Sequence, residues 1–149
     1  MPIGLAPNPR SRFQAHDIDH AALDSAPVLP LPFQQGVQNI RGYSAISQPS
    51  VQIIVEDFLP GTEFSWVFTH DEYQYCVSGE IEIEVWEPPL YAESTRTRLK
   101  AGSVYSFPVG ARMHVRVLGD QPFRHICFCP PNPGYPFPTI DELRAGNGA

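Results

Sequence analysis

Short runs of β-branched and aromatic residues, each followed by a turn-forming sequence, occupy residues 40–130. The clearest run is EIEIEVW at 80–86, in which three apolar residues alternate with three glutamates. Such alternation puts apolar side chains on one face of a strand and charged ones on the other. No run alternates with a helical pattern, as a parallel α/β sheet would require. The chain is therefore predicted to be all-β, with antiparallel strands in a barrel or a sandwich.

Eight of these runs are predicted as strands, at 51–58, 62–68, 72–77, 80–86, 95–100, 103–107, 114–118 and 124–128. Glycines stand between several of them, for example Gly61, Gly79 and Gly102. Glycine is favoured in tight reversals because it readily adopts the positive φ that they require. A chain of 149 residues is long enough for one domain with a single core.

Proline accounts for 17 of the 149 residues, about twice its usual share of roughly 5%, and many prolines lie near the two ends. We predict an N-terminal arm at 1–40 that packs on the barrel, a β-barrel at 41–130 and a C-terminal tail at 131–149. One or two helical turns are possible in HDIDHAALDS at 16–25. Thr139 followed by Glu142 is a capping-box pattern and predicts a short helix in the tail.

The charge pattern disfavours two classes of partner. The net charge is −6, and the ten lysines and arginines form no run, so nothing indicates binding to nucleic acid or to an anionic membrane.

The longest apolar stretches fall short of the roughly 20 residues that cross a bilayer, and the N-terminus lacks the layout of a secretory signal. The three cysteines suit a reducing compartment. A cytoplasmic protein with a small-molecule substrate is expected.

Two segments carry the residues that point to chemistry: PGTEFSWVFTHDEYQYCVSGE at 60–80 and AGSVYSFPVGARMH at 101–114. They resemble the two motifs of the cupin family, with matches at Gly61, Glu72 and Gly79 and at Gly102, Pro108, Gly110 and His114. The resemblance implies a single-domain cupin, a jelly-roll-like antiparallel β-barrel. It also implies a divalent-metal site inside the barrel, built around Glu72 and His114.

The resemblance has one departure. Where the first motif carries two histidines, near 65–68, this chain has SWVF, so the usual three-histidine site is missing. His70 is the nearest substitute. Both segments are also similar to those of ectoine synthase, a cupin that holds iron with a Glu, a Tyr and a His. That similarity implies Glu72, Tyr105 and His114 as ligands, and such a set suits Fe, Mn or Zn.

Strand alternation groups further residues with these ligands. His70, Glu72, Gln74 and Cys76 share one face of the run at 72–77, which is expected to point into the barrel. Arg116 follows His114 by two and is expected to share its face. The predicted substrate-binding residues are Gln74, Cys76, Arg116 and Trp66, and the predicted acid–base residues are His70 and Tyr105.

Other readings of these residues stay open. Tyr105 is either a ligand or an aromatic that fills the barrel. His125, Cys127 and Cys129 alternate along the last run, but they lack the Cys-x₂-Cys spacing of a structural zinc site and are interpreted as packing residues. His16 and His20 have a helical metal-site spacing, yet their polar, proline-flanked segment is interpreted as a surface turn.

The sequence thus predicts a metal-dependent enzyme that acts on a small polar metabolite. A lyase, dehydratase or cyclase fits best, with the metal as a Lewis acid and a His or Tyr as acid or base. An Fe(II)-dependent dioxygenase and a non-catalytic metabolite-binding cupin are the alternatives. A homodimer is also predicted, because the arm could cover an exposed strand edge.

Overall fold

The computed structural model describes residues 12–31, 35–132, 135 and 137–147. Ten strands and two helices are formed within them. The strands are β1 (Gln35–Val37), β2 (Ile40–Gln48), β3 (Val51–Phe58), β4 (Glu63–Val67), β5 (Glu72–Ser78), β6 (Glu80–Trp86), β7 (Ser94–Lys100), β8 (Val104–Phe107), β9 (Arg112–Leu118) and β10 (Phe123–Cys129). The helices are α1 (His20–Asp24) and α2 (Ile140–Asn147).

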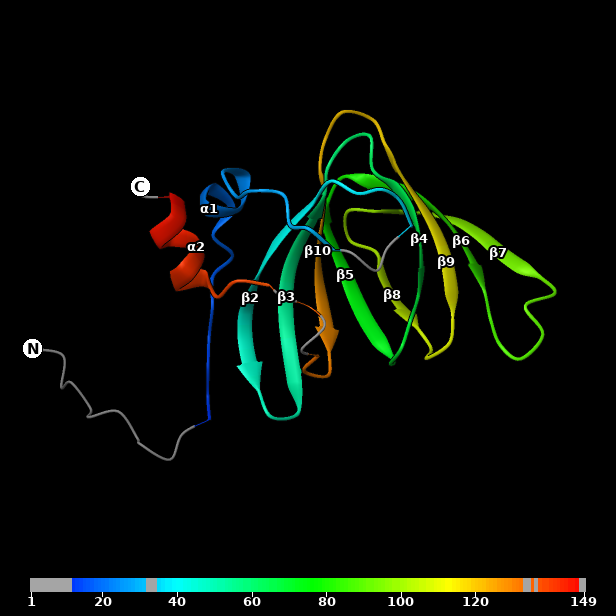
Figure 1. Cartoon of the computed structure of the whole chain (residues 1–149), viewed down its shortest axis with the longest axis horizontal. Coiled ribbons are helices and arrows are strands. Elements are labelled where there is room, and N and C mark those ends of the chain that lie inside the picture. Colours follow the sequence, from blue (N-terminus) through cyan, green and yellow to red (C-terminus); the bar gives the residue numbers. More distant parts are fainter. Residues whose placement is uncertain (1–11, 32–34, 133–134, 136, 148–149) are drawn as a thin grey trace, which may run out of the picture.

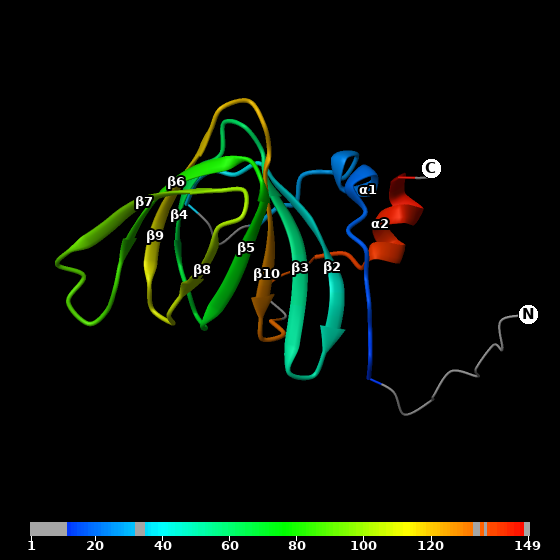
Figure 2. The ribbon, with the colours of Figure 1, turned by 180° about the vertical axis from the view of Figure 1, so that it is seen from behind.

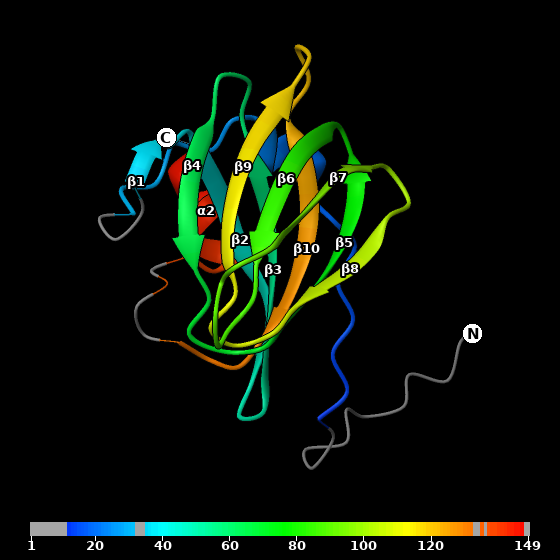
Figure 3. The same cartoon turned by 90° about the vertical axis from the view of Figure 1, so that its right-hand side faces the viewer.

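The strands form two five-stranded antiparallel sheets that face each other (Figure 1). The first sheet has the order β1-β4-β9-β6-β7 and the second has the order β2-β3-β10-β5-β8. The chain crosses between the sheets, because strands that follow one another after β3 lie mostly in different sheets. Figure 3 shows the first sheet in front of the second. This arrangement confirms the predicted all-β, jelly-roll-like fold.

The core lies between the sheets, and β6 shows how the sequence builds it. Ile81 and Ile83 are 2% exposed, whereas the glutamates that alternate with them form ion pairs with arginines of β7 and β9. The alternation predicted for 80–86 is confirmed. Between the sheets, the ring of Phe58 from β3 meets the ring of Phe64 from β4 edge to face, with centroids 5.1 Å apart. Burial of such aromatic rings contributes most of the hydrophobic stabilisation of a small core.

The two helices cover the outer face of the second sheet over β2 (Figures 1 and 2). Tyr43 of β2 is fully buried beneath them, and its hydroxyl bonds His16 Nε2 at 2.6 Å. Helix α2 begins as the capping box predicts: the Thr139 amide donates to Glu142 Oε2 at 2.8 Å, and the Glu142 amide donates to Thr139 Oγ1 at 3.2 Å. The helices therefore fix the chain ends that the structure describes onto one side of the sandwich.

The predicted N-terminal arm joins the sheets at its end. Residues 35–37 pair with β4 as β1, and α1 occupies the part of the arm predicted to form one or two helical turns. Residues 1–11 lie outside the described part of the chain. Neither α1 nor α2 is long and apolar enough to cross a membrane.

Candidate functional site

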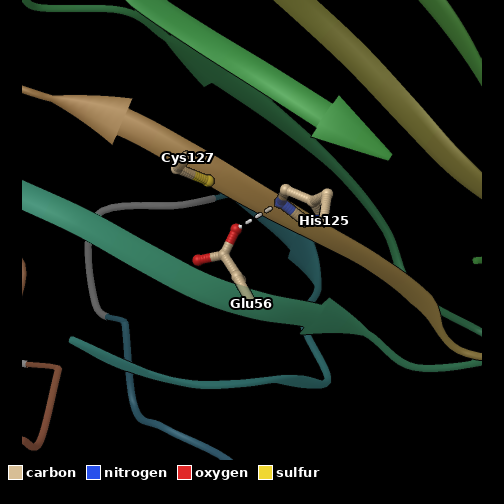
Figure 4. Close-up of side chains that lie close together, drawn as sticks. All are labelled: Glu56, His125 and Cys127. Atoms are coloured by element: carbon tan, nitrogen blue, oxygen red, sulfur yellow. Dashed lines mark hydrogen bonds and ion pairs between the residues drawn. The ribbon is translucent and has the colours of Figure 1, made fainter. Parts of the chain in front are cut away.

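Three polar side chains meet on the inner face of the second sheet (Figure 4). Glu56 of β3 and His125 of β10 are register partners, and His125 Nε2 lies 2.9 Å from Glu56 Oε1. Cys127 follows His125 by two residues and so shares its face. One ligand atom from each of the three residues lies within 4.8 Å of the others. We call Glu56, His125 and Cys127 the β3–β10 cluster.

Strand β5 extends this cluster with two more polar residues. Gln74 is the register partner of Cys127, and its Nε2 donates to Glu72 Oε1 at 3.1 Å. The Cys127 thiol lies close enough to the Glu72 carboxyl for each to influence the pKa of the other. Burial raises the pKa of Glu72, and the charge of Glu56 raises it further, while the bond from Gln74 opposes them. The inner face thus holds two carboxyl groups, which are costly to ionise together away from water.

Two further polar atoms beside these residues are buried without a hydrogen bond in the described structure: the Tyr105 hydroxyl and His70 Nε2. Burial raises the pKa of Tyr105 well above its ordinary value, and neighbouring thiols and carboxyls add to that effect. His70 Nδ1 bonds the Asp71 carbonyl at 3.0 Å. Because a carbonyl only accepts, Nδ1 carries the proton and Nε2 a free lone pair. One donor and one acceptor therefore stand unused at the inner face.

A cavity of about 40 Å³ opens between the two sheets at this place. This volume holds a few water-sized groups, since one water needs roughly 10–15 Å³ of such space. The polar part of its lining is Glu56, Glu72, Gln74, Cys127 and Cys129, and the remainder is apolar and largely aromatic. A polar patch in an apolar cavity is the usual form of a small-ligand site.

The positions of the missing motif histidines face the same cavity. Trp66 and Phe68 line it, with ring centroids 6.5 Å apart and planes at 87°. From the second motif, Met113 lines it and is 5% exposed. None of these three side chains suits a hard divalent ion, so Glu72 lacks the partners that the cupin motifs imply. The motif positions therefore do not fit a metal, whereas the β3–β10 cluster offers oxygen, nitrogen and sulfur donors that do.

The expectation that His114 holds a metal beside Glu72 is wrong for a geometric reason. His114 lies on the outer face of the first sheet, with 41% of its side chain exposed. There it contacts Ser65 Oγ at 3.0 Å through Nδ1 and Glu63 Oε1 at 2.9 Å through Nε2. Arg116 shares that outer face and pairs with Glu82 at 3.2 Å, so its predicted interior role is also wrong. Adjacent residues of a strand point to opposite faces, and Met113 takes the inward place.

The other predicted residues divide into two groups. Glu72, Gln74 and Trp66 line the cavity as expected, and Tyr105 and His70 lie beside it with their unpaired atoms. Cys76 shares the inward face of β5, but its thiol bonds the carbonyls of Ser78 and Gly79, and it lies outside the cavity lining.

Sequence reasoning missed the β3–β10 cluster. The alternation of His125 and Cys127 was visible, but it was interpreted as packing because it lacks zinc-finger spacing. Glu56 lies in a run without histidine or cysteine, and only the strand register brings it to His125, 69 residues away.

Solved structures with a similar fold include a cupin domain. The Cnp3 cupin domain of Schizosaccharomyces pombe matches with a TM-score of 0.53 at 22% identity, over 80% of this chain and 75% of that one. The chain has the cupin fold. KdgF from Halomonas sp. matches this chain with a TM-score of 0.53 at 20% identity, over 66% of this chain and 88% of that one. An oxalate decarboxylase matches with a TM-score of 0.52 at 17% identity, over 66% of this chain and 27% of that one.

These identities establish the likeness at the level of fold alone. No family model matches this chain's sequence, and neither does any curated protein. Arguments about its chemistry therefore depend on its own residues.

Proposed function

We propose that this cupin is a metal-dependent enzyme that acts on a small polar molecule in the cavity between its sheets. The observation that carries the proposal is the β3–β10 cluster: a carboxylate, an imidazole and a thiol with ligand atoms within 4.8 Å, at the wall of an apolar cavity. His125 is fully buried and Glu56 has 12% of its side chain exposed. Such groups are costly to bury unless they bind one another or an ion.

The donor set indicates the class of ion. Thiolate and imidazole favour zinc or iron, and the carboxylate also suits manganese. When bound, such an ion would act as a Lewis acid toward a carbonyl or carboxyl oxygen of the substrate. The residues of the family motifs would not hold it, so the metal centre proposed here differs in place from the one that the sequence motifs imply.

The unpaired atoms beside the cavity suit an elimination. His70 Nε2, with its free lone pair, would accept a proton from a carbon next to a carbonyl, and the C–H electron pair would become the new C=C bond. Tyr105, which burial keeps protonated, would give its proton to the departing hydroxyl group, which leaves as water. The proton that Tyr105 has lost is then restored from His70 through solvent. Aromatic side chains around the cavity exclude bulk water from this exchange.

Metal analysis of matched variants tests the proposal. The parent protein should bind close to one Zn, Mn or Fe per chain, and Glu56→Gln with Cys127→Ser should remove it. His114→Ala, on the outer face, is the control that should retain it. The loaded protein should turn over members of a panel of small β-hydroxy carbonyl compounds, and chelation should stop turnover. A parent that takes up no metal from any of the three salts would refute the proposal.

One observation favours a non-catalytic, metabolite-binding cupin as the second candidate. Trp66, Phe68 and Met113 fill the motif positions of the cavity with apolar side chains. A metal-free protein that binds a small molecule without changing it would support this candidate. Turnover that requires oxygen would instead favour the dioxygenase.

A further inference from the structure

The lining of the cavity has an uneven charge. It contains two carboxyl residues, Glu56 and Glu72, while no lysine or arginine occurs among its described residues. Glu72 is 7% exposed and takes part in no ion pair within the described structure. Within the described structure, its carboxyl accepts a hydrogen bond from the Gln74 amide. The cavity therefore offers carboxyl groups to a bound cation, and its described lining has no cationic side chain with which to balance a bound anion.

Aromatic rings form much of the rest of the lining. Trp66 of β4 lies near two other rings. Its centroid is 6.5 Å from that of Phe68, with planes at 87°, and 6.0 Å from that of Tyr135, with planes at 49°. Three rings at such different angles cannot stack on a flat ligand together. They can each turn a face or an edge toward a rounded one.

We propose that the cavity binds a small organic cation, an ammonium group carrying a few carbon atoms, between the Glu72 carboxylate and the faces of Trp66, Phe68 and Tyr135. The π face of an aromatic ring attracts a cation, and tryptophan does so most strongly. A buried carboxylate supplies the opposite charge that an ammonium group needs when it leaves water. The cavity of about 40 Å³ limits the ligand to a few heavy atoms near this end.

This inference rests on the proposed function and names the class of its substrate. Binding of a metal and binding of an organic cation are compatible in charge at this site. A divalent ion held by Glu56 and a Cys127 thiolate would neutralise both of these groups, with His125 neutral. Glu72 would then remain as the single carboxylate for the cation. A substrate with a carboxylate and no amino group would be repelled by the like charge of Glu72.

Binding of three probes of similar size tests the inference. Trimethylammonium, uncharged tert-butanol and acetate are titrated into the full chain by calorimetry, once after chelation and once after loading with zinc. Trimethylammonium should bind at least about tenfold more tightly than tert-butanol, as a desolvated cation–π contact implies. Acetate should not bind the chelated protein. Equal affinity for trimethylammonium and tert-butanol would show a merely apolar cavity and overturn the inference.

Matched variants locate the binding. Trp66→Leu and Glu72→Gln should each weaken trimethylammonium binding about tenfold or more, while Trp66→Phe keeps a π face and should retain most of it. Trp86→Leu and Glu82→Gln change residues outside the cavity lining and should bind like the parent. Unchanged affinity in both Trp66→Leu and Glu72→Gln would refute the inference, and circular dichroism verifies that each variant is folded.

The two proposals can fail separately. If trimethylammonium binds the chelated protein and no metal salt is retained, the metal-dependent enzyme is refuted and cation binding stands. If zinc is retained and trimethylammonium does not bind either form, cation binding is refuted and the metal centre stands.

Discussion

The Glu56 carboxylate and the His125 imidazole face each other as register partners on β3 and β10, 2.9 Å apart and almost wholly out of water. Two neighbouring strands hold both side chains, so a metal that binds there needs little reorganisation of the backbone. A ligand that binds only the folded protein stabilises it by mass action. Metal binding at this place should therefore be visible as thermal stability.

The first prediction concerns this stabilisation. A metal present at a hundred times its dissociation constant stabilises by about 2.7 kcal/mol, which raises the Tm of a domain of this size by roughly 5–10 °C. Calorimetric scans with zinc and with chelator should show this difference for the parent. Cys127→Ser should lose most of it. A shift of the same size in Cys127→Ser would mean that the metal binds elsewhere.

The second prediction concerns His114, which the motif match points to as a ligand. Its side chain lies on the outer face, so His114→Ala should leave the metal content unchanged and alter the free energy of unfolding by less than about 0.5 kcal/mol. Elemental analysis and urea denaturation measure the two quantities. Loss of the metal in this variant would restore the original expectation and contradict the placement of β9.

Strand positions could be predicted well because local alternation determines them. The runs at 51–58 and 80–86 agree with β3 and β6 at both ends. The inward face of β5 was also predicted correctly, with Glu72, Gln74 and Cys76 buried. Strand β2 was missed, because helices cover its outer face and a register shift between Ser44 and Ile46 breaks its alternation.

The candidate site was harder to predict because it depends on contacts between distant strands. In HVRVL, the valines at 115 and 117 already indicated which face is buried, and they placed His114 outside. The motif resemblance outweighed this local pattern and led to the wrong face. The β3–β10 cluster could not be recognised from either run alone, since the register that joins Glu56 to His125 is a property of the folded sheet.

The third prediction concerns pH. Burial raises the pKa of the Cys76 thiol from 9.0 to about 11. As pH rises through 9, the thiol ionises first in the unfolded chain, so stability falls between about pH 9 and 11 and levels off above. The loss should be on the order of 2 kcal/mol. Cys76→Ala should start less stable at pH 7, yet lose less between pH 9 and 11.

Urea denaturation of both proteins at several pH values measures that difference. Tyrosines and lysines titrate in both proteins, so only the difference between the two curves reports on Cys76. Parallel curves for the parent and for Cys76→Ala would contradict the prediction.

The fourth prediction concerns the buried ion pair between Asp57 of β3 and Arg124 of β10, an arginine that also bonds α1. Arg124 donates to both carboxylate oxygens of Asp57 at 2.8 Å, and its Nη2 also bonds Asp24 of α1 at 2.6 Å. Asp57 is fully buried and accepts a further bond from Arg41 at 2.8 Å. Asp57→Asn removes the charge that balances two guanidinium groups. Because one member of a buried pair is lost, unfolding should become easier by about 3–5 kcal/mol.

The exposed pair of Glu82 and Arg116 provides the comparison for Asp57→Asn. These side chains are 3.2 Å apart, with 40% and 51% of their surfaces exposed, so water screens their attraction. Glu82→Gln should therefore cost less than about 1 kcal/mol. Urea denaturation of the metal-free proteins measures both changes on one scale. Similar losses in the two variants would contradict the prediction, because they would show that burial does not strengthen the ion pair of Asp57 with Arg124.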